Sequence, residues 1–448
     1  MSDVPGPVAT AERISAIDVL RGVAVLGILV INIDYFALPH ADKSAAGTEW
    51  AGVFWPSELS ARGLAAWIAV RALFEGRMRA IFSMLFGASA VLLTTRLEGR
   101  GQDARVADIY YRRTLWLLLF GVLHAYLLWE GDILYSYAVG GLVLFPFRKL
   151  PGRTLIALGA ALLALSVPRA AYLAHQREAL RAEAARADAD EAAGQALSRK
   201  ERDAQAEWDE IAESLRPDAQ VLSDNLADYR GSYARLFARR ASLVVIVESS
   251  DFYGWAFIDG VGMMLIGMGL LRLGVLTGAR SGRLYAALAI AGYAIGVPIG
   301  VAATRALGRQ RFDAVAIAWI TAWYEPARLA VALGHVGVVM LLLRTGWARW
   351  LARGLGDVGR MALTSYLGAT LICTTLFNGY GLGLFGALTR PQLALVTLGI
   401  WCFQIAFSHV WLRAFHFGPA EWAWRSLTYW KIQPLRRRAA DLPRLAAS

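Results

Sequence analysis

A series of apolar segments, each of roughly membrane-spanning length, runs through this chain of 448 residues. A bilayer core of about 30 Å needs about 20 consecutive apolar residues in a helix. Ten segments approach this length, near residues 16–38, 79–95, 114–130, 133–147, 154–173, 253–273, 284–303, 326–344, 361–378 and 391–411. Because backbone polar groups must be paired inside lipid, these segments predict an all-α, polytopic membrane bundle of about ten transmembrane helices.

The composition agrees with insertion in a membrane. Hydrophobic residues make up 57% of the chain and charged residues only 18%, which is a low share for a soluble domain. The net charge is +11, but Lys and Arg lie mostly at the ends of the apolar segments, so no nucleic-acid partner is expected. The lipid bilayer is the expected partner. Glycine-rich stretches such as 260–269 predict close helix contacts and are compatible with a homodimer.

The distribution of Lys and Arg predicts the orientation of the chain. Basic residues fill the connections after the second, fourth, sixth and eighth apolar segments and the C-terminal tail. Since cytoplasmic connections are enriched in Lys and Arg, both termini are predicted to be cytoplasmic. The first apolar segment is read as a retained helix rather than a cleaved signal peptide. The loop expected at 304–325 is also basic and does not fit the alternation.

Residues 174–240 differ from the rest of the chain. They are rich in Ala, Arg and Glu, and acids recur three or four residues from bases, which is typical of exposed helices. The predicted orientation makes this segment a helical extracytoplasmic insertion between an N-terminal membrane half, 1–173, and a C-terminal membrane half, 241–448. We interpret the insertion as a solvated excursion without chemistry. A lid or a partner-docking element is the alternative.

Ionisable residues at membrane depth are candidates for function, because an unpaired charge there is costly. One set is expected near the outer face, with catalytic candidates His124, Asp132, Glu75 and Arg77 and acceptor-side candidates Asn32, Asp34, Glu130 and Asn378. The imidazole of His124 is suited to proton transfer near neutral pH, and helix packing is its alternative role. We expect the four catalytic candidates to converge on one cavity, since isolated charges are unfavourable at that depth.

A second polar set is expected at the cytoplasmic face and consists of Asp18, Arg21, Arg360, Ser365, Glu421 and Arg425. Asp18 and Arg21 are three residues apart and therefore share one helix face. The arginines suit a phosphate or carboxylate group of a cytosolic donor, whereas local ion pairing is the alternative. No metal site is expected, because both cysteines lie in apolar stretches and no Cys/His spacing typical of a metal site occurs.

Five stretches carry a resemblance to a known bacterial family. They are "DVLRGVAVLGILVINI" (18–33), "FEGRMRAIFSMLFG" (74–87), "GVLHAYLLWEGDILYSYAVGGLVLFPFR" (121–148), "GRMALTSYL" (359–367) and "FGPAEWAWRSLTY" (417–429). In this order along nearly the whole chain, they resemble the YeiB-like inner-membrane proteins, whose C-terminal half is the domain of unknown function 418. The resemblance implies a multi-pass protein of the bacterial inner membrane. The insertion 174–240 lies outside these motifs.

The start of the first helix adds a more distant resemblance. Asp18, Arg21 and Gly22 form an Asp-x-x-Arg-Gly opening similar to that of membrane acyltransferases such as heparan-α-glucosaminide N-acetyltransferase. Those enzymes use a His to move an acyl group from cytosolic acyl-CoA to an acceptor across the membrane. The resemblance implies a membrane acyltransferase with acyl-CoA as donor. Two alternatives stay open, a transporter of a small solute and a non-catalytic membrane scaffold.

Overall fold

The computed structural model describes residues 15–39, 60–215, 219–309 and 313–437. Helices are the regular elements of these residues, apart from one β-bridge between Phe415 and Arg436, and the predicted all-α fold is confirmed. The first half comprises α1 (Ser15–Ala37), α2 (Ala61–Phe74), α3 (Arg77–Glu98), η2 (Asp103–Arg105), α4 (Val106–Leu127), α5 (Leu134–Leu144), η3 (Phe145–Lys149), α6 (Gly152–Ala164), α7 (Ser166–Ala192), α8 (Arg199–Leu215) and α9 (Ala219–Tyr229). The second half comprises α10 (Tyr233–Ile246), the π-helical η4 (Val247–Ala256), α11 (Phe257–Arg272), α12 (Gly282–Arg309), α13 (Ala314–Thr345), α14 (Arg349–Arg360), α15 (Ala362–Phe377), α16 (Arg390–Ala414) and α17 (Pro419–Tyr429).

Seven helices of the described chain are long and apolar enough to cross a membrane. They are Ser15–Ala37, Ala61–Glu98, Gly152–Ala192, Tyr233–Arg272, Gly282–Arg309, Ala314–Thr345 and Arg390–Ala414. The other three predicted spans fall on α4, α5 and α15. α5 has 11 residues, or about 16 Å at 1.5 Å per residue, which is too short to cross a bilayer alone. The structure therefore confirms a multi-pass helical bundle, whereas the number of ten spans stays a prediction.

The segment 304–325 is not the loop that the sequence predicts. α12 continues to Arg309 and α13 begins at Ala314, so most of the segment is helical. Asp313 caps α13, because its carboxylate accepts hydrogen bonds from the N–H groups of Val315 at 3.1 Å and Ala316 at 3.0 Å. Arg305 and Arg309 extend α12 beyond its apolar part, whereas α13 begins with the apolar stretch 314–324, which the sequence prediction left outside its span because Glu325 and Pro326 follow it.

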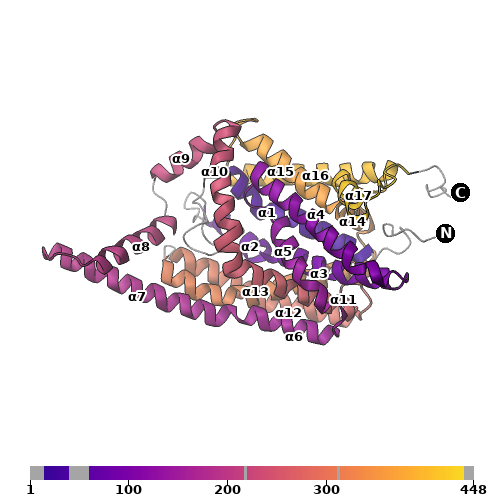
Figure 1. Ribbon diagram of the computed structural model, residues 1–448, viewed down its shortest axis with the longest axis horizontal. Helices are drawn as coiled ribbons and strands as arrows, with labels where there is room; N and C mark the ends of the chain where they lie inside the picture. The colour runs from indigo at the N-terminus through magenta and orange to yellow at the C-terminus, as the bar shows by residue number, and fades with distance from the viewer. Residues whose placement is uncertain (1–14, 40–59, 216–218, 310–312, 438–448) are drawn as a thin grey trace.

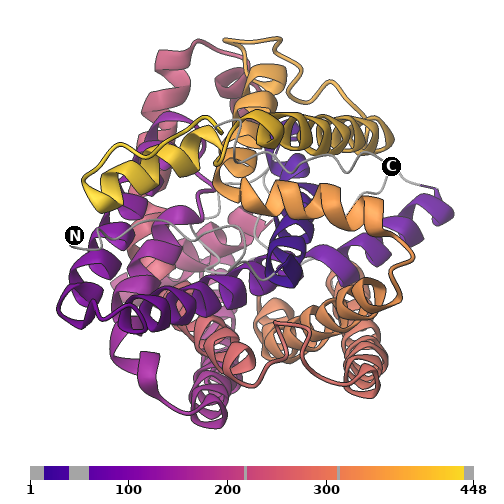
Figure 2. The same cartoon turned by 90° about the vertical axis from the view of Figure 1, so that its right-hand side faces the viewer.

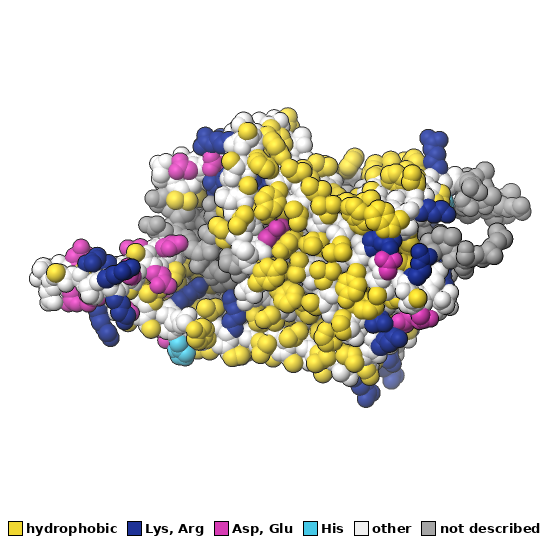
Figure 3. Space-filling model, in the orientation of Figure 1, with side chains coloured by type: hydrophobic (Ala, Val, Ile, Leu, Met, Phe, Trp, Pro, Cys, Tyr) yellow, Lys and Arg dark blue, Asp and Glu magenta, His cyan; other side chains and the backbone are white. Residues whose placement is uncertain are grey.

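The molecule is elongated, and its helices run mostly along the long dimension (Figure 1). Hydrophobic side chains gather over its middle and charged side chains gather mostly toward its two ends (Figure 3). The helices of the insertion, α7 to α9, project at one end, and α14 and α17 lie at the other. Figure 2, which looks onto the second end, shows α1 among the surrounding helices. This distribution is what a belt of lipid contact between two aqueous faces requires.

The main core lies between α3, α11 and their neighbours α1, α5, α6 and α13. Met84, Met263, Met264 and Met268 are completely buried there. Gly267 of α11 lies directly against the backbone of Met84, so that a side chain at this position would collide with the Met84 carbonyl. The close helix contact predicted for residues 260–269 is therefore confirmed, and its basis is a small residue at the crossing point.

Candidate functional site

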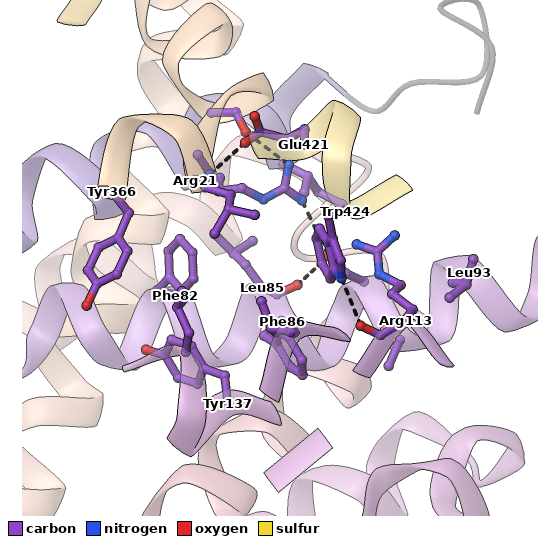
Figure 4. Close-up of a pocket in the computed structure, with 18 of the residues that line it drawn as sticks. Arg21, Phe82, Leu85, Phe86, Leu93, Arg113, Tyr137, Tyr366, Glu421 and Trp424 are labelled. Atoms are coloured by element: carbon purple, nitrogen blue, oxygen red, sulfur yellow. Dashed lines mark hydrogen bonds between the residues drawn. The ribbon is translucent and has the colours of Figure 1, made fainter. Parts of the chain in front are cut away.

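A cavity of about 220 Å³ lies between α1, α3, α4, α5, α15 and α17. At one end it is bordered by five arginines, namely Arg21, Arg96, Arg113, Arg360 and Arg425. At the other end aromatic rings form its wall, among them Phe82, Tyr137 and Tyr366. In Figure 4, Arg113 lies on the side opposite Phe82, Tyr137 and Tyr366, with Trp424 next to it. The cavity is thus cationic at one end and apolar at the other.

Arg21 is held at the cationic end by three contacts. Its guanidinium lies 2.8 Å from Asp18 Oδ1, and it donates to the carbonyl oxygen of Gly359 at 3.3 Å and to Ser89 Oγ at 3.4 Å. α14 approaches α1 very closely here, because a Cβ on Gly359 would collide with the backbone of Asp18. Asp18 and Arg21 thus form the local ion pair that was the alternative to a donor-binding role, and that role stays a prediction. Glycine at position 359 is what lets the arginine reach the neighbouring helix.

Two further arginines at this end have no carboxylate in direct contact. Within the described part of the chain, Arg113 and Arg425 have no carboxylate within ion-pair distance. The guanidinium carbon of Arg113 lies 4.0 Å from the ring centre of Trp424, and that of Arg425 lies 4.8 Å from Phe417. Burial, together with the neighbouring charge of Arg113, lowers the pKa of Arg425 to about 10, so it remains a cation at neutral pH.

The carboxylate of Glu421 is hydrogen-bonded to the start of α15 and is not free to bind a ligand. Its Oε1 accepts hydrogen bonds from the N–H groups of Leu363 at 2.7 Å and Thr364 at 3.2 Å, and its Oε2 accepts one from Thr364 Oγ1 at 2.5 Å. These are the free N–H groups at the start of α15, where a negative charge is favourable. Burial nevertheless raises the pKa of Glu421. The carboxylate fixes α17 across the cavity opening and does not neutralise Arg425 directly.

The remaining members of the cytoplasmic set differ in position. Arg360 borders the cavity and lies 3.3 Å from Asp357, whose other oxygen lies 2.9 Å from His409 Nδ1. Ser365 is buried outside the cavity lining, and its carbonyl accepts a hydrogen bond from Gln404 at 2.8 Å. Five of the six predicted residues therefore border one cavity, and Ser365 lies behind it.

His124 and Asp132 form a pair behind the aromatic end of the cavity. His124 is 2% exposed, its Nδ1 lies 2.8 Å from Asp132 Oδ1, and its Nε2 lies 3.0 Å from Thr370 Oγ1. The ring of Tyr366, which lines the cavity, separates this pair from it. The ring centres of Tyr366 and His124 are 5.1 Å apart. The Tyr366 hydroxyl accepts a hydrogen bond from Ile133 N–H at 3.3 Å. A carboxylate that orients one ring nitrogen leaves the other as the proton acceptor, as general-base catalysis requires.

Glu75 and Arg77 lie in a different cluster, around the junction of α2 and α3. Glu75 Oε1 is 2.7 Å from Arg71, which also lies 3.8 Å from Asp34. Arg77, 2% exposed, donates to the carbonyl oxygen of Glu75 at 2.5 Å. Gly76 adopts φ +67°, and a side chain there would collide with the Tyr324 hydroxyl. Neither Glu75 nor Arg77 contacts the His124–Asp132 pair, and none of the four is among the described residues that line the cavity. The catalytic assignment of these residues stays a prediction.

The other acceptor-side candidates each have their own surroundings. Asp34 pairs with Arg390 at 2.5 Å, and Asn32 is half-buried on the same helix. Glu130 accepts a hydrogen bond from Tyr229 and lies 3.5 Å from Arg240 Nε. Asn378 is buried at the end of α15 and donates to the hydroxyl of Tyr380 at 3.2 Å. These contacts attach α9, α10 and the loop after α15 to the bundle, which is a sufficient structural role.

Sequence reasoning missed a second buried ionic cluster. Arg328, 1% exposed, contacts Asp259 and lies 2.5 Å from Glu325, while Arg79 lies 4.0 Å from Asp259. A signal was available, because all four charges interrupt or border apolar segments. Sequence reasoning also missed Arg113, Phe82, Tyr137 and Tyr366, and no sequence signal separates these residues from interfacial or core residues.

Together, the apolar helices and the polar cavity define a multi-pass helical membrane protein with charged residues buried in its interior. The chain belongs to the family described as "Protein of unknown function (DUF418)", whose sequence model matches residues 270–431. The family resemblance predicted from the motifs is thereby confirmed.

Bacterial relatives match over nearly the whole chain. The uncharacterized protein YxaH of Bacillus subtilis (strain 168) is 30% identical over 434 residues, which cover 96% of this chain and 98% of that protein. The uncharacterized protein YeiB of Escherichia coli (strain K12) is 33% identical over 435 residues, which cover 93% and 96%. An uncharacterized 39.9 kDa protein of Bacillus acidopullulyticus is 27% identical over 442 residues, covering 97% and 99%. No solved structure matches the chain.

Proposed function

We propose that this protein transfers an acyl group from a donor on the cytoplasmic side of the bacterial inner membrane to an acceptor on the other side. The observation that carries the proposal is the cavity, which joins the cluster of arginines at one end to the neighbourhood of the His124–Asp132 pair at the other. An acyltransferase that works across a membrane needs these two features together: cations for the donor's phosphates and a base for the acceptor.

The orientation follows from charge. The end with the start of α1, α14 and α17 also carries the basic connections after α3 and α13, with Arg96 and Arg349 among their residues. Positive connections favour the cytoplasm, so this end faces the cytoplasm and the insertion 174–240 faces outward. Under this orientation both termini are cytoplasmic, and the arginines of the cavity face the compartment that contains acyl-CoA.

The proposed reaction is an acyl transfer from a thioester. His124 Nε2 takes the proton of the acceptor hydroxyl or amine, the acceptor atom bonds to the thioester carbonyl carbon, and the carbon–sulfur bond breaks. The leaving thiolate takes a proton from water on the donor side, and the His124 imidazolium releases its proton to water on the acceptor side, which restores the base. Asp132 holds Nδ1 of His124 throughout and stabilises the imidazolium. Because Tyr366 and Thr370 now enclose His124, one of these side chains has to move when the acceptor enters.

Donor binding tests the proposal. We expect acyl-CoA to bind the purified protein, and Arg113→Gln to weaken binding by about 1.5–3 kcal/mol, the range for a hydrogen bond to a charged group. Arg349→Gln is the matched control, because Arg349 is exposed on the same face and lies outside the cavity. Isothermal titration calorimetry measures both. If the wild-type protein binds no acyl-CoA, the enzyme proposal fails.

A transporter of a small solute is the second candidate, and the buried ionic clusters favour it. Glu75, Asp259 and Glu325 lie at membrane depth with arginine partners, an arrangement that marks ion and proton pathways in transport proteins. A transporter would change the protonation of these carboxylates during its cycle. Solute-dependent proton uptake into proteoliposomes, without acyl-CoA binding, would select this function over acyl transfer.

A further inference from the structure

We infer that the cavity takes the single acyl chain of an amphiphile with a phosphate-bearing head, and that Phe82 limits the length of the chain. The inference concerns the cavity of the proposed function. It rests on the proposed function only where it identifies the amphiphile as the acyl donor. It specifies a substrate class that an Arg-rich opening alone does not, namely a chain of several carbons rather than an acetyl group.

The depth of the cavity is the first argument. On α3 the lining residues run from Arg96 at the cationic end to Phe82 at the aromatic end. A rise of 1.5 Å per residue places these two positions about 21 Å apart along the helix. α1 runs antiparallel along the same wall, from Asp18 at the cationic end to Ile28 at the aromatic end. A ligand with its phosphate at the arginines can therefore extend an apolar chain along this length.

The chemistry of the deep wall is the second argument. The hydroxyl groups that could make it polar are already occupied, because Tyr137 bonds Ser83 and the Arg79 carbonyl, both at 3.3 Å. The Tyr110 hydroxyl donates to Gly141 at 2.6 Å. What remains facing the cavity is ring and aliphatic surface, including Phe82, which stacks on Tyr137 with ring centres 5.4 Å apart. Cavities with such walls exclude water and bind apolar groups.

The charge at the opening is the third argument. Arg113 and Arg425 border the cavity without a carboxylate partner among the described residues, and each guanidinium lies over an aromatic ring. Two guanidinium groups held in this way are suited to phosphate oxygens, which they bind through paired hydrogen bonds. The cavity therefore combines a phosphate site with a long apolar extension, and the ligand that satisfies both is a chain with a phosphate-bearing head.

Alkyl phosphates of increasing chain length test the inference directly. Binding to the protein in nanodiscs is measured by calorimetry, with empty nanodiscs as the reference. We expect affinity to rise about fourfold for each added methylene, from the free energy of burying one such group, and then to reach a plateau. Phe82→Ala should move the plateau to longer chains. Ala90→Leu, which narrows the cavity about 9 Å from Arg96 along α3, should move it to shorter chains.

The control is Phe403→Ala, since Phe403 lies on α16 away from the cavity and is 55% exposed. It should leave the plateau unchanged. Partitioning of alkyl phosphates into empty nanodiscs rises with chain length without a plateau. The same behaviour with the protein present would mean that only membrane partitioning is measured, and it would overturn the inference. A plateau that neither Phe82→Ala nor Ala90→Leu displaces would overturn it as well.

The same titrations distinguish a water-soluble donor from a membrane lipid as the source of the chain. They also distinguish failure of this inference from failure of the proposed function. If acyl-CoA binds more tightly than lysophosphatidic acid of equal chain length, the ligand is a water-soluble donor, and the reverse order supports a membrane lipid; either order supports the chain site. Chain-dependent binding without any acyl transfer would keep this inference and remove the proposed function. Acetyl-CoA binding as tightly as long-chain acyl-CoA would keep the proposed function and remove this inference.

Discussion

Arg328 offers a strong test of the buried charges, because it holds two carboxylates inside the bundle. It is 1% exposed, contacts Asp259 and lies 2.5 Å from Glu325. Removing one partner of a buried ion pair costs about 3–5 kcal/mol, since the remaining charge stays desolvated. In this variant Asp259 still has Arg79 at 4.0 Å, and the remaining charge is therefore only partly balanced. We therefore expect Arg328→Met to lower the free energy of unfolding by about 4 kcal/mol.

Equilibrium unfolding in mixed micelles, followed by fluorescence of the 16 tryptophans, measures this loss. The control is Arg181→Met, because Arg181 pairs with Asp313 at 3.4 Å at an exposed site, where the expected loss is at most about 1 kcal/mol. A triple variant that also replaces Asp259 and Glu325 by leucine should recover most of the stability, since no uncompensated charge remains. A loss no larger for Arg328→Met than for the control would refute the account of this cluster.

Two further predictions concern helix packing and orientation. Gly359→Val should lower thermal stability and weaken donor binding together, because the new side chain meets the Asp18 backbone. Gly368→Val is the control and should do neither, since nothing lies within 4 Å of a Cβ at that position. Thermal unfolding measures the stability of both variants, and calorimetry measures their donor binding. A cysteine at Lys200, in a chain whose native cysteines are replaced by alanine, should react with an impermeant maleimide in intact spheroplasts and not in sealed inverted vesicles. Labelling only in inverted vesicles would reverse the orientation of the insertion.

The helices themselves were largely predictable, because the length and hydropathy of a segment decide whether it can cross a bilayer. Seven predicted spans coincide with long apolar helices. The main error, at 304–325, arose because Arg305 and Arg309 continue α12 and because α13 starts before Glu325, with the apolar stretch 314–324. The cytoplasmic set was also predictable in large part. Asp18, Arg360 and Arg425 lie at the ends of apolar segments, and that position alone assigns them a common depth.

The outer set shows what depth does not determine. Glu75 and His124 were expected to meet because both were placed near the outer face, yet they lie in separate clusters with separate partners. Which helices are neighbours depends on contacts between distant segments, and one sequence does not specify them. Phe82 and Tyr366 were missed for a related reason. Apolar and aromatic residues have the same pattern in a sequence whether they face lipid, the core or a cavity.

The proposal depends most directly on acyl transfer in proteoliposomes, with labelled acyl-CoA on the side of α14 and α17 and acceptor on the other. The account predicts that His124→Ala lowers transfer by about 100-fold or more, the usual effect of losing a general base, while donor affinity stays near that of the wild-type protein. His124→Ala does not remove any residue that lines the cavity, so binding and chemistry are separable. If His124→Ala transfers the acyl group as fast as the wild-type protein and still binds the donor, the assignment of His124 is contradicted. If the wild-type protein shows no transfer with any acyl-CoA and acceptor supplied, the proposed reaction is contradicted.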